Sequence, residues 1–161
     1  MKYSKIIGTG AYLPSKILSN KDLEKIFDTS DEWIQTRTGI SQRHIIGENE
    51  RTSDLAYQAA LDVLKNSSID PAEIDLILVA TTTPDKVFPS VACAVQRKLN
   101  IKNIPAFDIQ AVCSGFIFAL TTADSFIKSG TYKKILVIGA DSMSSITDYK
   151  DRSNAILWGD G

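Results

Sequence analysis

Residues 74–80 read IDLILVA, and six of these seven residues are apolar. A short apolar run rich in Leu, Ile and Val is typical of a strand covered on both faces. Residues 134–140, which read KILVIGA, show the same pattern. We therefore predict two buried strands here, and the segments around them decide what kind of sheet they form.

The flanking segments alternate between strand and helix patterns. Further strands are expected at residues 2–8, 106–109 and 153–158, and longer helices at residues 53–65, 89–99 and 115–128. Helices of this length between strands favour right-handed crossovers and therefore parallel pairing. The sequence predicts an α/β fold with a mainly parallel five-stranded sheet and helices on both faces.

Two short helices are expected between the first strand and residue 53. Asn20 can cap the first of them. Thr29 and Glu32 have the spacing of a capping box for the second, and Gly39 lies where that helix would end.

Composition excludes several classes of protein. The 161 residues suit one globular domain, and 18 Lys and Arg against 19 Asp and Glu leave a charge of −1. No general attraction to nucleic acid or to an anionic membrane follows from that balance. The apolar runs are too short to span a bilayer, and the first ten residues lack a signal-peptide pattern. We expect a cytoplasmic protein.

Cysteine and histidine are scarce. Cys93 and Cys113 are too few for a disulfide framework, and the single histidine, His44, makes a zinc site improbable, so no metal is expected. Cys93 lies within a helical pattern and is expected to be core. His44 is expected to be packed structure.

The helix that follows Cys113 begins with five consecutive apolar residues, 116–120. A helix that is apolar all round is normally buried on every side. A domain of this size has few places to bury one completely, so further protein is expected to cover it.

Cys113 lies in the sequence AVCSGF, where a strand gives way to a helix. The N-terminus of a helix stabilises a thiolate, and small neighbours leave room for a substrate carbonyl, so Cys113 is a candidate nucleophile. The alternative is a buried structural thiol, as most free cysteines are. Its position supports both interpretations equally.

Trp33 and Arg37 are four residues apart on one face of an expected helix that starts near Thr29. Such a face could stack a planar base on the indole and bind a phosphate with the guanidinium. The alternative, a partly buried tryptophan covered by an arginine, is the more common arrangement.

Six stretches together resemble a known family. They are KIIGTGAYLP, DTSDEWIQTRTGI, LILVATTTPD, FPSVACAVQ, AVCSGF and WGDG, in this order and at this spacing. The chain is similar over essentially all its length to 3-oxoacyl-[acyl-carrier-protein] synthase III, the condensing enzyme that starts bacterial type II fatty-acid synthesis.

The resemblance implies a thiolase-like fold, in which two similar βαβαβαββ halves pack around central helices. Residues 1–161 would form the N-terminal half, with the C-terminal half absent. In the implied reaction a cysteine takes an acetyl or other short acyl group from coenzyme A. Malonyl-carrier protein is then decarboxylated and attacks that thioester. Coenzyme A is here a substrate carrier, and no further cofactor is implied.

The resemblance also assigns residues. Cys113 matches the nucleophile, and Phe88 matches a loop residue that crosses a homodimer to limit the partner's acyl pocket. Four residues match positions that contact the adenine end of coenzyme A, with the second and fourth sandwiching the ring: Thr29, Trp33, Arg37 and Arg152.

The family's catalytic His and Asn, and its surface for carrier protein, belong to the second half. The isolated chain is therefore expected to be inactive in condensation and to meet carrier protein only in a full-length protein. Two other functions remain open. One is a non-catalytic, oligomerising half-fold, and the other is a different thiolase-like acyl-CoA acyltransferase.

Overall fold

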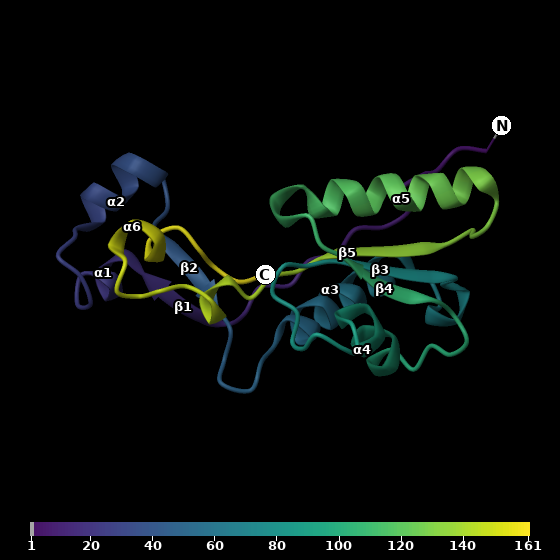
Figure 1. Ribbon diagram of the computed structural model, residues 1–161, viewed down its shortest axis with the longest axis horizontal. Coiled ribbons are helices and arrows are strands. Elements are labelled where there is room, and N and C mark those ends of the chain that lie inside the picture. Colours follow the sequence, from purple (N-terminus) through teal and green to yellow (C-terminus); the bar gives the residue numbers. More distant parts are fainter. Residues whose placement is uncertain (1) are drawn as a thin grey trace. The chain divides into compact units, whose positions relative to one another are not determined.

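The computed structural model describes residues 2–161, which fall into two compact units. Unit 1 contains the residues up to Tyr12 together with Arg51–Asp141, and unit 2 contains Leu13–Glu50 and Ser142–Gly161. Each unit has its own sheet, and Figure 1 labels the helices and strands.

The sheet of unit 1 consists of three parallel strands. The central strand β3 (Leu76–Ala80) lies between β4 (Ala106–Ile109) and β5 (Ile135–Gly139). Every residue of β3 is buried, which confirms the covered strand predicted at residues 74–80. The expected strands at 106–109 and 134–140 are present as β4 and β5, but β5 is only partly buried, so the prediction that it is covered on both faces is wrong.

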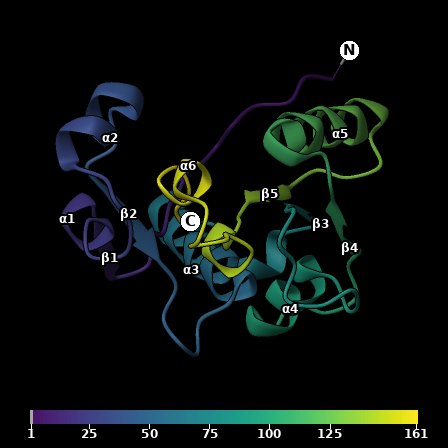
Figure 2. The same cartoon turned by 60° about the vertical axis from the view of Figure 1, so that its left-hand side comes forward.

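Helices cover both faces of this sheet, as predicted. The helix α5 (Gly115–Ser129) lies on one face, and α3 (Thr52–Ser67) and α4 (Val91–Lys98) lie on the other (Figures 1 and 2). Each of the three buries a stripe of small or aliphatic residues against its surroundings. All three long helices expected from the sequence are therefore present.

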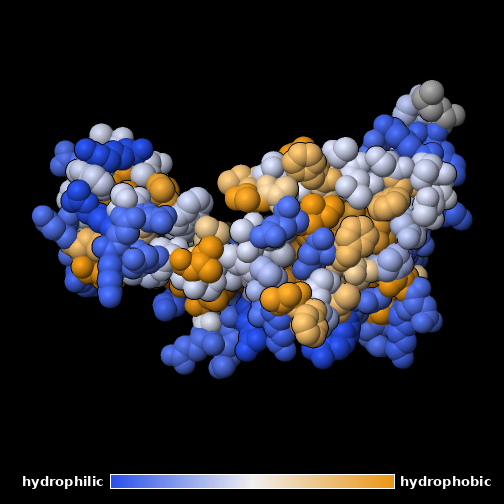
Figure 3. Space-filling view, in the orientation of Figure 1, coloured by the Kyte–Doolittle hydropathy of each residue, from blue (hydrophilic) through white to orange (hydrophobic). Residues whose placement is uncertain are grey.

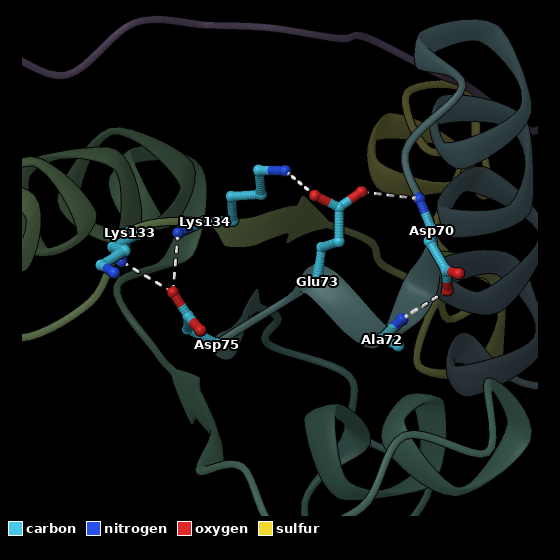
Figure 4. Close-up of polar contacts among 6 residues, drawn as sticks. All are labelled: Asp70, Ala72, Glu73, Asp75, Lys133 and Lys134. Carbon is cyan, nitrogen blue, oxygen red and sulfur yellow. Dashed lines mark hydrogen bonds and ion pairs between the residues drawn. The ribbon is translucent and has the colours of Figure 1, made fainter.

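Polar contacts join β3 and β5 at the edge where both strands begin (Figure 4). Asp70 caps the short helix η1 (Pro71–Glu73) by accepting from Ala72 N. One carboxylate oxygen of Asp75 accepts from the backbone N–H groups of both Lys133 and Lys134, at 2.8 and 3.0 Å. These two bonds lower the pKa of Asp75, because they favour its ionised form.

The prediction of a strand at residues 2–8 is wrong. The segment runs beside α3, where a Cβ at Gly10 would come within 2.3 Å of Val63 N. Ser4 Oγ donates to Asp124 Oδ1 of α5, and just beyond the segment Ala11 N donates to Asp62 Oδ2 of α3 at 3.0 Å. A cavity of about 820 Å³ is lined by residues 4–10 on one side and by β5 on another. Residues 2–8 therefore do not pair with β5.

The strand expected at residues 153–158 is also wrong, because this segment begins as the short helix α6 (Arg152–Ala155). Asp151 starts this helix by accepting from the N–H and the hydroxyl of Ser153, at 2.9 and 2.6 Å. Capping by a local carboxylate outweighs the apolar pattern here. The five-stranded sheet is thus replaced by three parallel strands and a separate hairpin.

That hairpin is the sheet of unit 2. Strand β1 (Lys16–Ser19) pairs antiparallel with β2 (Gln42–Ile45), and the helices α1 (Asn20–Leu23) and α2 (Asp31–Thr38) connect them. His44 is packed structure, as expected, with Nδ1 2.6 Å from the carbonyl oxygen of Pro14.

The core of unit 2 is small. Leu23, Ile34 and Ile156 are buried together, and Phe27 and Trp33 pack against them. A short helix η3 (Met143–Ser145) lies at the start of the second segment of this unit, which begins at Ser142. Trp33 therefore belongs partly to the core and is held in place by it.

Among residues 2–161, no helix is long and apolar enough to cross a membrane. Both cysteines are free thiols. No three His, Cys, Asp or Glu side chains in the described part of the chain gather where they could hold a metal ion.

Candidate functional site

Cys113 lies at the junction between β4 and α5, within the single turn η2 (Val112–Ser114). Its side chain is exposed, whereas that of Cys93 is half-buried within α4 and donates weakly to the carbonyl of Ala106 at 3.4 Å. Cys113 is thus the more exposed thiol, and Cys93, which the sequence placed in the core, is only half-buried. A nucleophile must be reachable, and Cys113 is the thiol that meets this condition.

The backbone immediately before this cysteine is strained. Val112 has φ = 50°, in the left-handed region that a β-branched side chain rarely adopts. Such a conformation costs about 1–3 kcal/mol and persists only where the surroundings hold it. It turns the chain sharply between strand and helix. Val112 was not singled out from the sequence, because a valine gives no signal for a left-handed turn.

Close packing holds the junction in place. Gly115, the first residue of α5, is buried, and a Cβ there would lie 3.3 Å from the Cβ of Ala80. Ser114 Oγ donates to the carbonyl of Ala111 at 2.7 Å, which closes the turn around Cys113. A small residue after Ser114 therefore lets the helix begin directly against the end of β3.

The loop after β3 is fixed by one carboxylate. Asp141 Oδ1 accepts from Thr82 N at 2.7 Å and Thr83 N at 3.0 Å, and from the hydroxyls of Thr81 and Thr83 at 3.1 and 2.8 Å. Because β3 and β5 are parallel, the segments that follow them meet at the same edge. Asp141 was not predicted, since only the sheet register brings it to this loop.

Phe88 lies further along the same loop. It is 81% exposed, and its neighbour Val87 is 95% exposed. The start of the loop is anchored to α3, since Asp85 accepts from Ser53 N at 2.9 Å. A fixed base and an exposed apolar tip suit a residue that contacts another surface. The partner expected from the resemblance remains a prediction.

In unit 2, three of the residues expected to bind coenzyme A come together. The guanidinium carbon of Arg37 lies 4.1 Å from the centre of the Trp33 ring, and that of Arg152 lies 4.5 Å from it. We call these three residues the clamp. Arg152 also donates from Nη1 to the carbonyl of Asp28 at 2.7 Å. Arginine over tryptophan is a favourable cation–π pair, and both cations could also bind phosphate.

Thr29, the fourth of these residues, does not cap α2. Ser30 is the cap, and its side chain accepts from Trp33 N at 3.1 Å. The hydroxyl oxygen of Thr29 is buried and has no hydrogen-bond partner among the described residues. An unsatisfied buried hydroxyl costs roughly 1–3 kcal/mol. The segment that leads into the clamp thus holds a buried hydroxyl whose hydrogen-bonding capacity is unused.

The first residue of α2 carries a stabilised negative charge. Gln35 and Asn20 donate to the two carboxylate oxygens of Asp31, at 2.6 and 2.7 Å. These bonds lower the pKa of Asp31, with the Gln35 bond the larger cause. The sequence assigned the cap of α1 to Asn20, but the cap is Ser19. Asn20 is instead a member of α1 with a buried side chain.

A family model and several curated proteins match the sequence of this chain. The family described as 3-Oxoacyl-[acyl-carrier-protein (ACP)] synthase III matches residues 107–161. The beta-ketoacyl-[acyl-carrier-protein] synthase III of Thiobacillus denitrificans is 60% identical over 162 residues, which cover 100% of this chain and 51% of that protein. The chain thus spans about half the length of the curated relatives it matches.

Solved structures also match the fold of this chain. The crystal structure of 3-oxoacyl-[acyl-carrier-protein] synthase III from Aquifex aeolicus matches with a TM-score of 0.94 and 58% identity, over 97% of this chain and 50% of that one. The priming beta-ketosynthase from the R1128 polyketide biosynthetic pathway matches with a TM-score of 0.95 and 36% identity, over 99% and 48%.

The fold is therefore a thiolase-like α/β half-fold, built from a three-stranded parallel sheet and a two-stranded hairpin. More specifically, the chain is a homologue of beta-ketoacyl-[acyl-carrier-protein] synthase III that corresponds to its N-terminal half.

Proposed function

We propose that this chain is the nucleophile-bearing half of a condensing enzyme that initiates type II fatty-acid synthesis. In this proposal Cys113 Sγ attacks the thioester carbonyl of acetyl-CoA or a short acyl-CoA. The bond from that carbonyl to the coenzyme A sulfur breaks, coenzyme A leaves as its thiol, and the acyl group stays on Cys113. The observation that carries the proposal is the exposed thiol at a strained strand-to-helix turn.

The second half-reaction would use malonyl-carrier protein. Loss of carbon dioxide leaves a carbanion on the malonyl unit, which attacks the acyl thioester and expels the Cys113 thiolate. The family's His and Asn for this step belong to the other half of the fold. His44, whose Nδ1 contacts Pro14 in unit 2, is not proposed to replace them. Residues 1–161 are therefore proposed to be one half-domain, inactive in condensation by itself.

Binding of coenzyme A is assigned to unit 2. In the proposal the clamp and Thr29 bind its adenine end, with the base between Trp33 and Arg152. The cation–π geometry and the unpartnered Thr29 hydroxyl support this assignment. The two guanidinium groups would bind phosphate oxygens, which is chemistry that arginine performs well.

A homodimer and a cytoplasmic location complete the proposal. Phe88 would reach a second copy and limit its acyl pocket, which is consistent with the exposed tip of the loop. Carrier protein would bind only a full-length protein. A non-catalytic oligomerising half-fold predicts the same exposed loop but no reactivity at Cys113.

A second candidate is an acyltransferase of the same fold that serves another pathway. It is favoured by the match to the priming ketosynthase of a polyketide pathway. Both candidates require the same transfer to Cys113 and differ in the acyl group and in the later partner.

Isotope exchange tests the transfer. The chain is incubated with acetyl-CoA and labelled free coenzyme A, and label is followed into acetyl-CoA. Reversible transfer through Cys113 predicts exchange by the wild type and by C93A, and none by C113S. Exchange that persists in C113S would contradict the proposal, and its absence from the wild type would favour the non-catalytic half-fold.

A further inference from the structure

Arg43, on β2, is a buried cation that hydrogen-bonds neutral oxygens. It is 3% exposed. Its Nε and Nη2 donate to the carbonyl of Ile156, with Nε at 3.0 Å, and its Nη1 donates to Asn20 Oδ1. Buried arginines are rare and are normally paired with carboxylates. The two acceptors of this one lie on different segments of unit 2, and each segment leads to the clamp.

The first acceptor ends the helix that carries Arg152. Ile156 directly follows α6, and Arg152 is the first residue of that helix. The last carbonyls of a helix have no partner within the helix and need an outside donor. Arg43 supplies two N–H groups to this carbonyl, so it fixes the end of α6. It thereby also fixes the position of Arg152, which lies one turn earlier.

The second acceptor controls the helix that carries Trp33. A guanidinium can only donate, so Asn20 must turn its carbonyl oxygen toward Arg43 and its amide group away. That amide then donates to Asp31 Oδ1 and to the carbonyl of Ile40, both at 2.7 Å. Asp31 is the first residue of α2, and Ile40 follows its C-cap Gly39. Asn20 therefore holds both ends of α2.

We propose that Arg43 is a positioning residue that holds α2 and α6, the helices from which the Trp33 and Arg152 side chains extend, and so sets the affinity for the adenine end of coenzyme A. This inference rests on the proposed function, in which these two side chains sandwich that ring. Arg43 reaches α6 through Ile156 and α2 through Asn20, and it touches no substrate.

Two substitutions separate this role from a contribution to stability. R43M keeps an unbranched side chain but removes every donor, so the Asn20 amide is free to turn and the Ile156 carbonyl loses its partner. R43K keeps the charge and part of the donor capacity, but without the planar fork that reaches two acceptors at once. Loss of one stacking contact to a base costs roughly 5–150-fold in affinity.

D160N is the matched control within the same unit. Asp160 is buried and accepts from Ile46 N at 2.7 Å and from the N–H and hydroxyl of Ser144 at 2.8 and 2.6 Å. None of these hydrogen bonds involves a residue of α2 or α6. D160N is therefore expected to lower the melting temperature without moving the clamp.

The probe is adenosine 3′,5′-bisphosphate, the adenine end of coenzyme A, and its affinity is measured by isothermal titration well below each melting temperature. We expect binding to the wild type, at least about tenfold weaker binding to R43M, an intermediate value for R43K and wild-type affinity for D160N. Wild-type affinity in R43M overturns the inference. So does a loss in D160N as large as that in R43M, because general destabilisation would then explain both.

If R43M does not fold, R43K decides the question, and unchanged affinity in folded R43K overturns the positioning role. The proposed function fails separately if the wild type binds no nucleotide and takes acetyl groups equally well from acetyl-CoA and from acetyl-pantetheine, which lacks the nucleotide. That result would remove the Arg43 inference as well. A wild type that binds the nucleotide while R43M is unaffected removes only the inference.

Discussion

The guanidinium of Arg152 lies 4.5 Å from the centre of the Trp33 ring. A flat base held between the two needs contacts of about 3.5 Å on each side, or roughly 7 Å in all. An adenine ring can therefore enter only if Arg152 moves away from Trp33 by about 2.5 Å. The hydrogen bond from Arg152 to the carbonyl of Asp28 would stretch or break in that movement.

Replacing Trp33 should weaken binding of the nucleotide. Stacking of a base on an aromatic ring contributes about 1–3 kcal/mol, which corresponds to roughly 5–150-fold in affinity. We expect a loss in this range for W33A with adenosine 3′,5′-bisphosphate, measured by isothermal titration. Y132A is the control, because the Tyr132 ring packs edge-on against Phe126 in unit 1 and lies outside the clamp. Equal losses in both variants would exclude a specific stacking role.

The stability of unit 2 should depend on pH through Asp31. Its pKa is lowered in the folded state by donors from Gln35 and Asn20. The stabilisation is therefore fully present above the unfolded-state pKa of about 3.9 and is lost as the pH falls toward the lower folded-state pKa. In thermal melts, D31N should be less stable than wild type at neutral pH, and the difference should shrink below about pH 3.9.

E48Q is the control for this experiment, since Glu48 is an exposed carboxylate elsewhere in unit 2. A difference between D31N and wild type that stays constant from pH 7 to pH 3 would contradict the assignment to ionised Asp31.

Some elements of the fold were predictable from the sequence and others were not. The strands at residues 74–80 and 134–140 were predictable from their apolar runs, although only the first is fully buried, and Cys113 because a strand-to-helix junction is visible in AVCSGF. Residues 2–8 have a strand pattern, but whether such a segment pairs depends on a distant edge, here that of β5. Local sequence carries no record of that edge.

The candidate site divides in the same way. Trp33 and Arg37 are one helical turn apart, so their contact was foreseeable, and the resemblance supplied Arg152. The sequence suggested Asn20 only as a cap and did not single out Arg43, because both are polar types that are usually exposed, and only the fold shows them buried in a shared network. Asp141 was missed because it reaches Thr81–Thr83 across the sheet.

Iodoacetamide should label Cys113 before Cys93. Cys113 is exposed at the strand-to-helix turn, whereas Cys93 is half-buried in α4 and its thiol faces the carbonyl of Ala106. Peptide mapping after brief alkylation gives the order, and C93A should label at the wild-type rate. Preferential labelling of Cys93 would contradict the placement of the nucleophile.

The chain should associate through the start of α5. The helix buries Gly115, Ala119 and Ala123, while Ile117 is 63% and Phe118 is 55% exposed. Figure 3 shows hydrophobic residues gathered over the beginning of this helix. The apolar run at residues 116–120 is thus left largely uncovered within unit 1, and contiguous apolar surface of this kind favours association.

Light scattering at micromolar concentration measures this tendency. I117D should shift the wild-type chain toward monomer, whereas I26D, at an exposed isoleucine of unit 2, should not. A monodisperse wild-type monomer that melts cooperatively would show that α5 needs no covering surface.

Acetyl transfer to Cys113 is the central claim, and mass spectrometry of the chain after incubation with acetyl-CoA tests it most directly. We predict one acetyl group per chain, mapped to the peptide that contains Cys113, absent from C113S and retained in C93A. An unmodified Cys113 peptide, or acetylation of the Cys93 peptide to the same extent, would contradict the account.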